Sequence, residues 1–365
     1  MRTSKALVMG CAMIDLEILK TLSEAAGISS CEEAVCSQLE TYMQPYVDRV
    51  IHDGLGSVIG IKGDDEAGPK TMLATHADEV GFFVKEIEAS GTLRLMPVGS
   101  WWTHMLLGHD FKVITQDGRQ IKGFIGSPAT HGMPSEQRAK TLAMEAIYLD
   151  LGVADKKEAE ALGIRIGDMV VPDTNFRVMN NPNYLAGKAF DNRASCAVGL
   201  YVLERLKGKK HVPLSFACTV QEEPGLRGAR TSTDLMHPEL AFAIDTTLAG
   251  DTPANANSCK LGGGVVISML DSNTVYHRGL IRYVEKVCKE QGIPYQYAVF
   301  NGGGTDSGNI HKSFEGIVNM TLSIPIRYMH TNQSIIHKQD LEACVDLLTY
   351  ILCTMDQQTF DMICA

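Results

Sequence analysis

The sequence predicts an α/β layer sandwich that is interrupted by an inserted, mainly β, domain. The 365-residue chain is long enough for two or three domains of ordinary size. Helical and strand patterns alternate at its beginning and throughout its second half, which is typical of α/β folds. Between these two parts lies a run of short strand patterns, and this run indicates a separate β domain.

The first part of the chain contains two amphipathic segments and two short strand patterns. Residues 14–22 and 32–50 place apolar side chains at three- and four-residue spacing, which predicts helices. Residues 57–62 and 71–76 are short and rich in β-formers, and the turn-like stretch 63–69 separates them. We therefore expect two neighbouring strands here.

From residue 80 to about residue 173 the pattern changes to many short strands. The expected strands are residues 81–88, 92–97, 111–115, 120–125, 147–150 and 169–172. The hairpin-type dipeptide Asp117-Gly118 separates two of them. We expect an inserted β-rich domain over residues 79–179, within an α/β domain formed by residues 1–78 and 180–365.

Helices and strands alternate again after residue 180. The expected helices are residues 192–206, 274–291 and 338–355, and the expected strands are residues 213–221, 241–245, 265–270 and 316–324. Such alternation predicts strands covered by helices in layers.

Composition and charge exclude several classes of protein. Hydrophobic residues make up 45% and charged residues 21% of the chain, as in soluble globular proteins. The 33 Lys and Arg against 43 Asp and Glu give a formal net charge of -10, which argues against a nonspecific nucleic-acid partner. No stretch approaches the roughly 20 apolar residues of a membrane span, so we expect no membrane partner either.

Cysteine usage indicates a reducing, cytoplasmic location. The ten cysteines are scattered along the chain and form no C-x-x-C pair. A short apolar run at residues 6–11 follows Arg2 and Lys5, but Asp15 comes soon after it. The run is shorter than the roughly 7 to 15 apolar residues of a signal peptide, so we do not expect export.

Polar side chains follow several of the predicted strands. In His76-Ala77-Asp78 the two polar residues are two positions apart, which places them on the same face of an extended chain. A carboxylate there can hold the imidazole tautomer that leaves the other ring nitrogen free to bind a metal. The simpler alternative for this motif alone is a surface hydrogen bond.

Two further motifs carry carboxylates. Asp191 stands where a helix is expected to begin, and taken alone it is equally well explained as a helix cap. Glu222 and Glu223 follow a buried-looking strand. One of them could coordinate a metal while the other acts as general base on water whose pKa the cation lowers. A solvated loop edge is the alternative for this pair.

Asp245 and His330 also follow apolar strand patterns. Each alone is an ordinary strand end. Together with the preceding motifs they give two histidines and three carboxylates at the ends of separate strands. That set of nitrogen and oxygen ligands suits two divalent cations about 3.5 to 4 Å apart with one bridging carboxylate.

The ordered motifs resemble those of the tetrahedral and glutamyl aminopeptidases, family 42 of the metallopeptidases. The motifs that carry the resemblance are His76-Ala77-Asp78-Glu79-Val80-Gly81, Asp191-Asn192-Arg193, Gln221-Glu222-Glu223, Asp245, Arg327-Tyr328-Met329-His330, Leu106-Leu107-Gly108, Ile121-Lys122-Gly123-Phe124-Ile125-Gly126, Gly163-Ile164-Arg165-Ile166-Gly167-Asp168 and Gly303-Gly304-Thr305-Asp306. They extend across almost the whole chain. The resemblance implies a three-layer α/β/α dinuclear-metallopeptidase domain with an inserted, PDZ-like dimerisation domain.

The resemblance also implies the roles of individual residues. The implied metal ligands are His76 and Asp245 for one ion, Glu223 and His330 for the other, and Asp191 as the bridge. Glu222 would be the general base and acid, and Asp78 would orient His76. The implied cofactors are two divalent metal ions per subunit, with Zn expected first and Co or Mn as alternatives.

The implied activity is removal of N-terminal residues from short peptides. The implied assembly is a homo-oligomer in which dimers form a hollow tetrahedral dodecamer. Pro224 departs from the small apolar residue usual after the Glu pair, and it favours an extended Glu223.

Three alternatives to the aminopeptidase remain at this point. A metal-dependent amidase acting on N-acyl amino acids could use the same ligands. A glycoside hydrolase needs two carboxylates roughly 5 to 10 Å apart and no metal-binding histidines, which the adjacent Glu222 and Glu223 and the two histidines argue against. The third alternative is a structural shell paralogue, and the intact ligand and base set argues against it.

Overall fold

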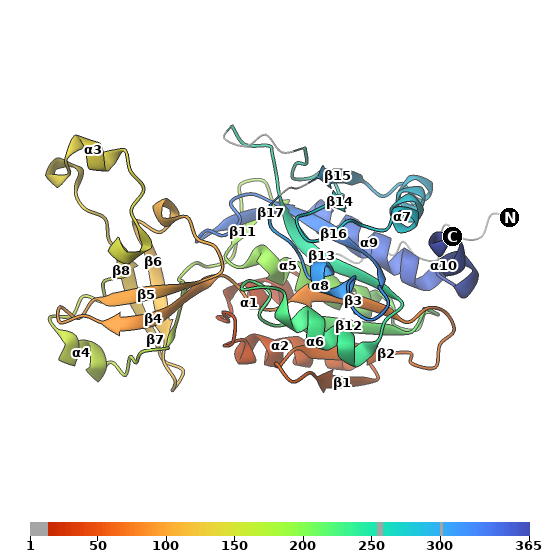
Figure 1. The fold of residues 1–365 in the computed structure, drawn as a ribbon, viewed down its shortest axis with the longest axis horizontal. Helices are drawn as coiled ribbons and strands as arrows, with labels where there is room; N and C mark the ends of the chain where they lie inside the picture. Colours follow the sequence, from red (N-terminus) through yellow and green to blue (C-terminus); the bar gives the residue numbers. More distant parts are fainter. Residues whose placement is uncertain (1–13, 254–257, 300–301) are drawn as a thin grey trace.

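The computed structural model describes residues 14–253, 258–299 and 302–365. The described chain forms two units: a larger one with helices on both sides of a sheet, and a smaller one built mainly of strands (Figure 1). The apolar run at residues 6–11 lies outside the described residues, so its interpretation stays a prediction.

An eight-stranded mixed sheet forms the centre of the larger unit. Its strands, in spatial order, are β1 (Arg49–His52), β2 (Val58–Lys62), β12 (Leu214–Thr219), β3 (Thr71–His76), β13 (Leu240–Leu248), β16 (Val318–Ile326), β14 (Val265–Leu270) and β15 (Tyr295–Val299). Strands β12, β3, β13 and β16 are mutually parallel. Their carboxyl ends therefore meet at one edge of the sheet, where open α/β sheets bind ligands.

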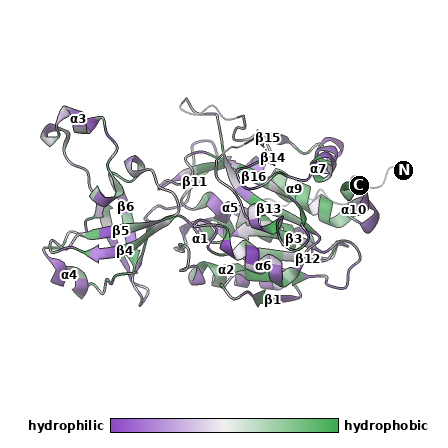
Figure 2. Ribbon diagram, viewed as in Figure 1, coloured by the Kyte–Doolittle hydropathy of each residue, from purple (hydrophilic) through white to green (hydrophobic). Residues whose placement is uncertain are grey.

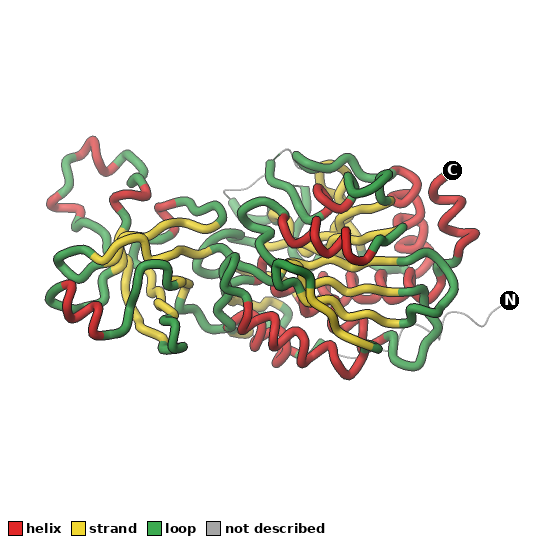
Figure 3. The backbone as a smooth tube through the Cα atoms, turned by 60° about the horizontal axis from the view of Figure 1, so that its bottom comes forward, coloured by secondary structure: helices red, strands yellow, loops and turns green. Residues whose placement is uncertain are grey.

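Helices cover both faces of this sheet, as Figure 3 shows. The helices on one face are α1 (Leu16–Glu24), α2 (Glu33–Met43), α5 (Phe190–Arg205), α7 (Arg278–Gln291) and α9 (Lys338–Thr354), and those on the other are α6 (Arg227–Met236) and α8 (Ser307–Ile310). A last helix, α10 (Gln357–Cys364), packs on α7. The predicted three-layer α/β/α architecture is confirmed.

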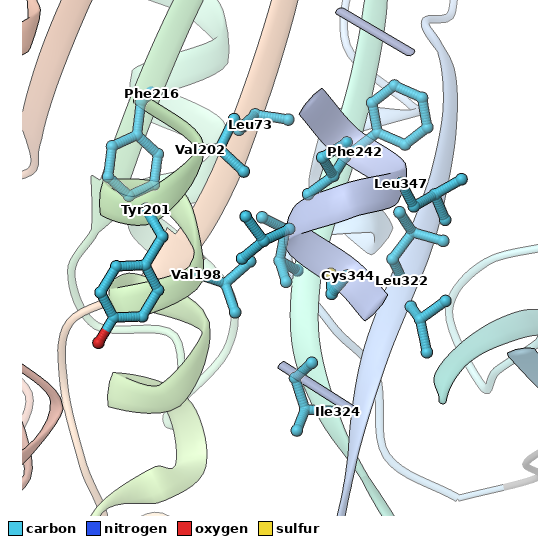
Figure 4. Close-up of a cluster of buried hydrophobic side chains, with 14 of the residues drawn as sticks. Leu73, Val198, Tyr201, Val202, Phe216, Phe242, Leu322, Ile324, Cys344 and Leu347 are labelled. Carbon is cyan, nitrogen blue, oxygen red and sulfur yellow. The ribbon is translucent and has the colours of Figure 1, made fainter. Parts of the chain in front are cut away.

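Alternation along the strands explains the two layers of core. Leu73 and Phe216 point to the face of α5, where they join Val198 and Val202 in one buried cluster (Figure 4). The next residues along the strands, such as Ala217, lie in a second cluster under α6 and α8. Small residues on that face let the short helices approach the sheet. Figure 2 shows that hydrophobic residues dominate the middle of the larger unit.

The smaller unit is a six-stranded antiparallel sheet. Its strands, in spatial order, are β7 (Gln120–Ile125), β6 (His109–Ile114), β9 (Met169–Pro172), β4 (Gly81–Ile87), β5 (Leu93–Val98) and β8 (Tyr148–Leu149). Paired backbone hydrogen bonds between Phe124 and Asp150 join its two outer strands, so the sheet curls into a barrel-like form. Phe82, Trp101 and Phe111 pack together inside it. The expectation of an inserted, mainly β unit is confirmed.

Short elements complete the described fold. Two small helices, α3 (Ser135–Arg138) and α4 (Lys156–Ala161), lie in the smaller unit. A three-stranded antiparallel sheet of β10 (Arg177–Val178), β11 (Tyr184–Gly187) and β17 (Ser334–His337) precedes α5 and α9 in the chain. This sheet pairs residues 177–187, which follow the smaller unit in the chain, with residues 334–337, which follow β16.

Some element boundaries differ from the predicted ones. Residues 32–50 form no single helix, because α2 ends at Met43 and Pro45 lies in a short 3-10 helix (Gln44–Tyr46) before β1. Proline lacks the N–H group that a longer helix would need there. Strand β12 ends two residues earlier than expected and β13 ends three residues later. Asp245 therefore lies within a strand.

None of the helices in the described part of the chain is both long and apolar enough to span a bilayer. The cysteines from Cys31 to Cys364, all of which lie in described segments, are free thiols.

Candidate metal centre

The site forms where the carboxyl ends of β3 and β12 meet the start of α5. His76 is the last residue of β3 and is paired in register with Thr219, the last residue of β12. Glu222 and Glu223 follow β12 in a turn that is closed by a hydrogen bond from Gly225 N–H to the Glu222 carbonyl. The parallel pairing of the strands thus brings the predicted histidine and the glutamate pair to the same place.

Asp191 and Asp245 enter from neighbouring elements. Asp191 lies at the start of α5, where its backbone is not helical and the peptide bond to Asn192 is cis. Asn192 donates a side-chain hydrogen bond to the Ile244 carbonyl on β13. Since Ile244 precedes Asp245, this bond holds the two aspartate-bearing elements together. The structure places Asp191 as an inward-facing group, which differs from the alternative that it caps the helix.

His330 lies in the loop after β16. Tyr328 and His330 both adopt left-handed backbone conformations, with φ of 62° and 55°. Arg327 forms a two-point ion pair with Asp251, at 2.7 and 2.8 Å, which anchors the base of the loop. Residues forced into this region of φ often mark functional sites.

The side chains of the two histidines meet the carboxylates at short distances. His76 Nε2 lies 3.2 Å from Asp191 Oδ1 and 3.8 Å from Asp245 Oδ1. His330 Nε2 lies 3.3 Å from Asp191 Oδ2 and 3.4 Å from Glu223 Oε1. Asp191 therefore presents one oxygen to each histidine.

These atoms form two groups suited to metal ions. One group is His76, Asp191 and Asp245, and the other is Asp191, Glu223 and His330. The ligand atoms of each group lie within 4.8 Å of one another. Two ligands bound tetrahedrally to zinc at about 2.0 to 2.1 Å lie roughly 3.3 Å apart, which matches the closer pairs here.

Buried oxygens without partners support the same reading. Asp191 Oδ1 and Glu223 Oε1 are buried and accept no well-aligned hydrogen bond, although a histidine Nε2 lies 3.2 and 3.4 Å from them, respectively. A buried carboxylate oxygen without a donor is costly, and a cation between the ligands would satisfy both atoms. The residues present therefore fit a pair of divalent ions that share Asp191.

Crowding of the carboxylates changes the protonation of the centre. Burial and the neighbouring Asp245 and Glu223 raise the pKa of Glu222 well above its usual value. Burial opposes protonation of His330, but Glu223 and Asp191 outweigh it and raise the pKa of His330 to about 11. Without metal the histidines hold protons that balance the carboxylates, so metal binding must release protons.

Asp78 is fully buried behind the metal centre. Its contacts are not limited to His76. His76 Nδ1 lies 3.1 Å from the Asp78 backbone carbonyl oxygen and 3.5 Å from its Oδ1. The Asp78 carboxylate accepts hydrogen bonds from the backbone N–H groups of Glu222 and Glu223, at 2.9 and 3.1 Å, and from the Ser29 hydroxyl, at 2.5 Å. It therefore fixes the glutamate turn as well as facing the imidazole.

Sequence reasoning missed Glu32 as a neighbour of the site. Its side chain is buried and accepts a hydrogen bond from Gln221 N–H at 3.0 Å, just before the glutamate pair. Gln221 has a φ of 56°, so its backbone also lies in the left-handed region. Glu32 lies about 190 residues away in the chain, and no local pattern indicates this contact.

A buried cluster of charged side chains lies next to the segment that carries Asp191. Lys188 Nζ lies 2.6 and 2.8 Å from the two carboxylate oxygens of Glu79, and both residues are buried. Arg193 is fully buried and donates to the carbonyls of Ala77 and Gly27, at 2.6 and 3.0 Å. Lys188 and Arg193 flank Asp191 in the sequence, so the cluster holds the Asp191 segment against the end of β3. The sequence signal available for this cluster was the pair of basic residues, Lys188 and Arg193, on either side of Asp191.

The centre opens into a cavity of about 300 Å³. Glu222 lines this cavity together with the ligand groups but belongs to neither of them. Ser100, from the smaller unit, also lines it. In addition, a side chain at Gly99 would come within 2.9 Å of Glu223 Oε2, so the smaller unit reaches the rim of the site.

Comparison with known proteins identifies the family. The family model of the M42 glutamyl aminopeptidases matches residues 56–347. The chain belongs to this family. It is 33% identical to the putative aminopeptidase FrvX of Escherichia coli, over 94% of this chain and 96% of the relative. It is 31% identical to the glutamyl aminopeptidase of Lactococcus lactis, over 93% and 96%.

Solved structures of this family show the same fold. A TET aminopeptidase from a marine-sediment member of the Thaumarchaeota has a TM-score of 0.92 and 34% identity, covering 95% of this chain and 99% of that one. The Pyrococcus horikoshii TET1 peptidase, which can assemble into a tetrahedron or a large octahedral shell, has a TM-score of 0.82 and 28% identity, covering 93% and 99%.

Proposed function

We propose that this M42 protein is a metal-dependent aminopeptidase that removes N-terminal residues from short peptides. One observation carries the proposal: the two ligand groups share Asp191, and Glu222 lines the same cavity without belonging to either group. That division provides metal ligands and a separate carboxylate for proton transfer. Membership of an aminopeptidase family supports the same chemistry.

The residues have the following proposed roles. His76 and Asp245 would hold one divalent ion, Glu223 and His330 would hold the other, and Asp191 would bridge them. When bound, the ions would supply Lewis acidity for the scissile carbonyl and lower the pKa of water in the site. Zn suits this set of nitrogen and oxygen ligands, and Co or Mn are the alternatives.

Glu222 would take the proton from the attacking water and deliver it to the leaving amine. Its carboxyl Oε2 lies 3.9 Å from His76 Nε2, at the edge of the proposed metal positions. Asp78 would keep the base in place through the backbone of the glutamate turn and would orient His76. His76 and Asp245 are buried, which limits the access of bulk water to the first ligand group.

Peptides with free and with acetylated N-termini test the reaction. The protein would be incubated with both kinds, with and without a chelator, and the products followed by mass spectrometry. Stepwise loss of N-terminal residues from free peptides alone, abolished by chelator and restored by Zn, Co or Mn, is the expected result. Cleavage of acylated substrates alone would assign a deacylase or amidase instead.

The proposal extends to domains and assembly. Residues 1–78 and 180–365 would form the catalytic domain, and residues 79–179 the insert that mediates dimerisation. We propose that dimers assemble into a tetrahedral dodecamer, because the Pyrococcus horikoshii TET1 peptidase can assemble into a tetrahedron. We also propose a cytoplasmic location, because the cysteines from Cys31 to Cys364 are free thiols. Light scattering should then give twelve times the 39.8 kDa mass of the chain. A monomer or an isolated dimer would contradict this assembly.

A further inference from the structure

The cavity of the metal centre has a second wall, beyond the metal ligands. Strands β14, β15 and β16 provide it, with Ser268 and Leu270 on β14, Ala298 on β15 and Ser323 on β16. Met329, next to His330, also lines the cavity. A substrate held with its scissile bond at the metal centre would place a neighbouring side chain in this space, which we name the β14–β16 pocket.

No lysine or arginine lines the cavity among the residues that the structure describes. Among the described residues of the cavity wall, only His76 and His330 have side chains that can carry positive charge, and carboxylates already oppose both. An acidic substrate side chain in the β14–β16 pocket would therefore be desolvated without a cationic side chain to pair with. Such an unpaired charge is strongly unfavourable.

The described cavity wall carries one carboxylate besides those of the metal centre, Asp271. Its Oδ1 accepts the N–H groups of Asn273 and Thr274, both at 2.7 Å, and its Oδ2 accepts the Tyr276 hydroxyl. Oδ1 is therefore filled, whereas Oδ2 keeps one acceptor site. The wall thus does not oppose a basic substrate side chain as it opposes an acidic one.

The remaining wall is uncharged. Leu270, Ala298 and Met329 supply apolar contacts. The hydroxyls of Ser268 and Ser323 lie 3.3 Å apart and can bond to each other. A neutral side chain can therefore fill the pocket without stranding a buried charge, whereas an acidic side chain is opposed.

We infer that the β14–β16 pocket selects peptides whose N-terminal side chain is neutral over peptides whose N-terminal side chain is acidic. The inference rests on the proposed aminopeptidase function. It goes beyond family membership, because the family is described by the glutamyl aminopeptidases.

The test is a series of tripeptides X-Ala-Ala cleaved by the metal-loaded, full-length protein. Glutamine and glutamate at X have nearly the same shape and differ in charge, so the pair isolates the effect of an acidic side chain. We expect kcat/KM to be at least ten-fold higher for glutamine than for glutamate. Equal or faster cleavage of the glutamate peptide would overturn the inference while leaving the aminopeptidase intact. Cleavage of no peptide in the series would overturn the proposed function and this inference with it.

Substitutions at the pocket give a second readout. Leu270→Arg adds a positive charge to the wall, so the ratio of glutamate to glutamine cleavage should rise at least ten-fold. Leu235→Arg, on an exposed position of α6 outside the cavity, is the matched control and should leave the ratio unchanged. Ala298→Arg places the charge on β15 and serves if Leu270→Arg does not fold. An unchanged ratio in a folded pocket variant would contradict the inference.

Binding without turnover provides an independent check. The metal-loaded Glu222→Gln protein should still bind peptides, and calorimetric titration should rank them in the same order as cleavage by the unaltered protein. Tighter binding of the glutamate peptide than of the glutamine peptide would contradict the selection of neutral side chains.

Discussion

Glu222 is the side chain on which the proposed chemistry depends most directly. It lies 3.9 Å from His76 Nε2 and outside both ligand groups. Glu222→Gln keeps the size and polarity of the side chain but removes its ability to take a proton. We expect turnover to fall by about 10² to 10⁴ while bound metal is retained.

Steady-state kinetics and metal analysis of the purified Glu222→Gln protein check this. Glu315→Gln, at an exposed position, is the matched control. Full activity of Glu222→Gln would show that another group is the base.

Glu32 positions the turn that carries Glu222, through a single hydrogen bond to Gln221 N–H. Glu32→Ala removes the acceptor and frees the turn, so we expect kcat to fall about ten-fold with little change in KM. Glu32→Gln keeps an oxygen acceptor and should restore most of the rate. Glu33→Ala, the exposed neighbour in the first turn of α2, should have no effect. Equal losses in the Ala and Gln variants would argue against the hydrogen bond as the cause.

At the scale of elements, helix α5 approaches β12 through Gly199. A Cβ atom at this position would lie 2.2 Å from the buried ring of Phe216. Gly199→Val should therefore force α5 away from the sheet and destabilise the fold by about 1 to 3 kcal/mol. Thermal unfolding should show a midpoint lower by several degrees.

Gly54→Val is the matched control for this substitution, because nothing lies within 4 Å of a Cβ atom there. A Gly199→Val protein as stable as the control would mean that the ring of Phe216 can move aside.

Asp340, in the first turn of helix α9, joins this helix to the loop that precedes β14. This buried carboxyl accepts hydrogen bonds from the N–H groups of Gly262 and Gly264, at 2.8 and 2.7 Å. Burial raises its pKa from 3.8 to about 7. Between pH about 4 and about 7, the Asp340 carboxyl is therefore protonated in the folded chain and ionised in the unfolded chain. The stability that this proton contributes is complete below pH about 4 and is lost as the pH rises through about 7.

The expected pH effect of Asp340 is on the order of 4 kcal/mol. Thermal midpoints of the unaltered protein and of Asp340→Asn, measured between pH 5 and 8, would check it. The decline with pH should be shallower in Asp340→Asn, because the titrating group is gone. Parallel declines in both proteins would show that this carboxyl titrates normally.

At the scale of the whole molecule, the proposed metal ions would link elements that are far apart in sequence. The ligands come from β3, the start of α5, the turn after β12, strand β13 and the loop after β16. A ligand that binds only the folded state stabilises it in proportion to the logarithm of its concentration. We therefore expect a chelator to lower the unfolding temperature and added Zn, Co or Mn to restore it.

His330→Ala separates the two ions. The loss of one ligand from the second group should leave about one metal per chain and part of the metal-induced stabilisation. Metal analysis after dialysis, combined with thermal unfolding, checks both. Retention of two tightly bound metals would show that His330 is not a ligand. His131→Ala, at an exposed position outside both ligand groups, is the control.

Local sequence patterns determined much of the architecture. Short runs rich in β-formers predict the strands β2 and β3, and the three- and four-residue spacing of apolar residues predicts the helices α7 and α9, all close to their observed places. The cluster of short strand patterns likewise predicts the smaller unit. His76 and the Glu222–Glu223 pair stand out because each follows an apolar strand that must end at the sheet's edge.

Only the tertiary structure decided how these ends meet. The order β12, β3, β13 places His76 beside residues more than a hundred positions away, and α5 turns the two oxygens of Asp191 toward different histidines. Glu32 and the uncharged β14–β16 pocket likewise depend on contacts between distant segments. Periodicity records which face of an element is buried, but it does not record which distant element covers that face. Strand order and loop conformation therefore had to come from the packed chain.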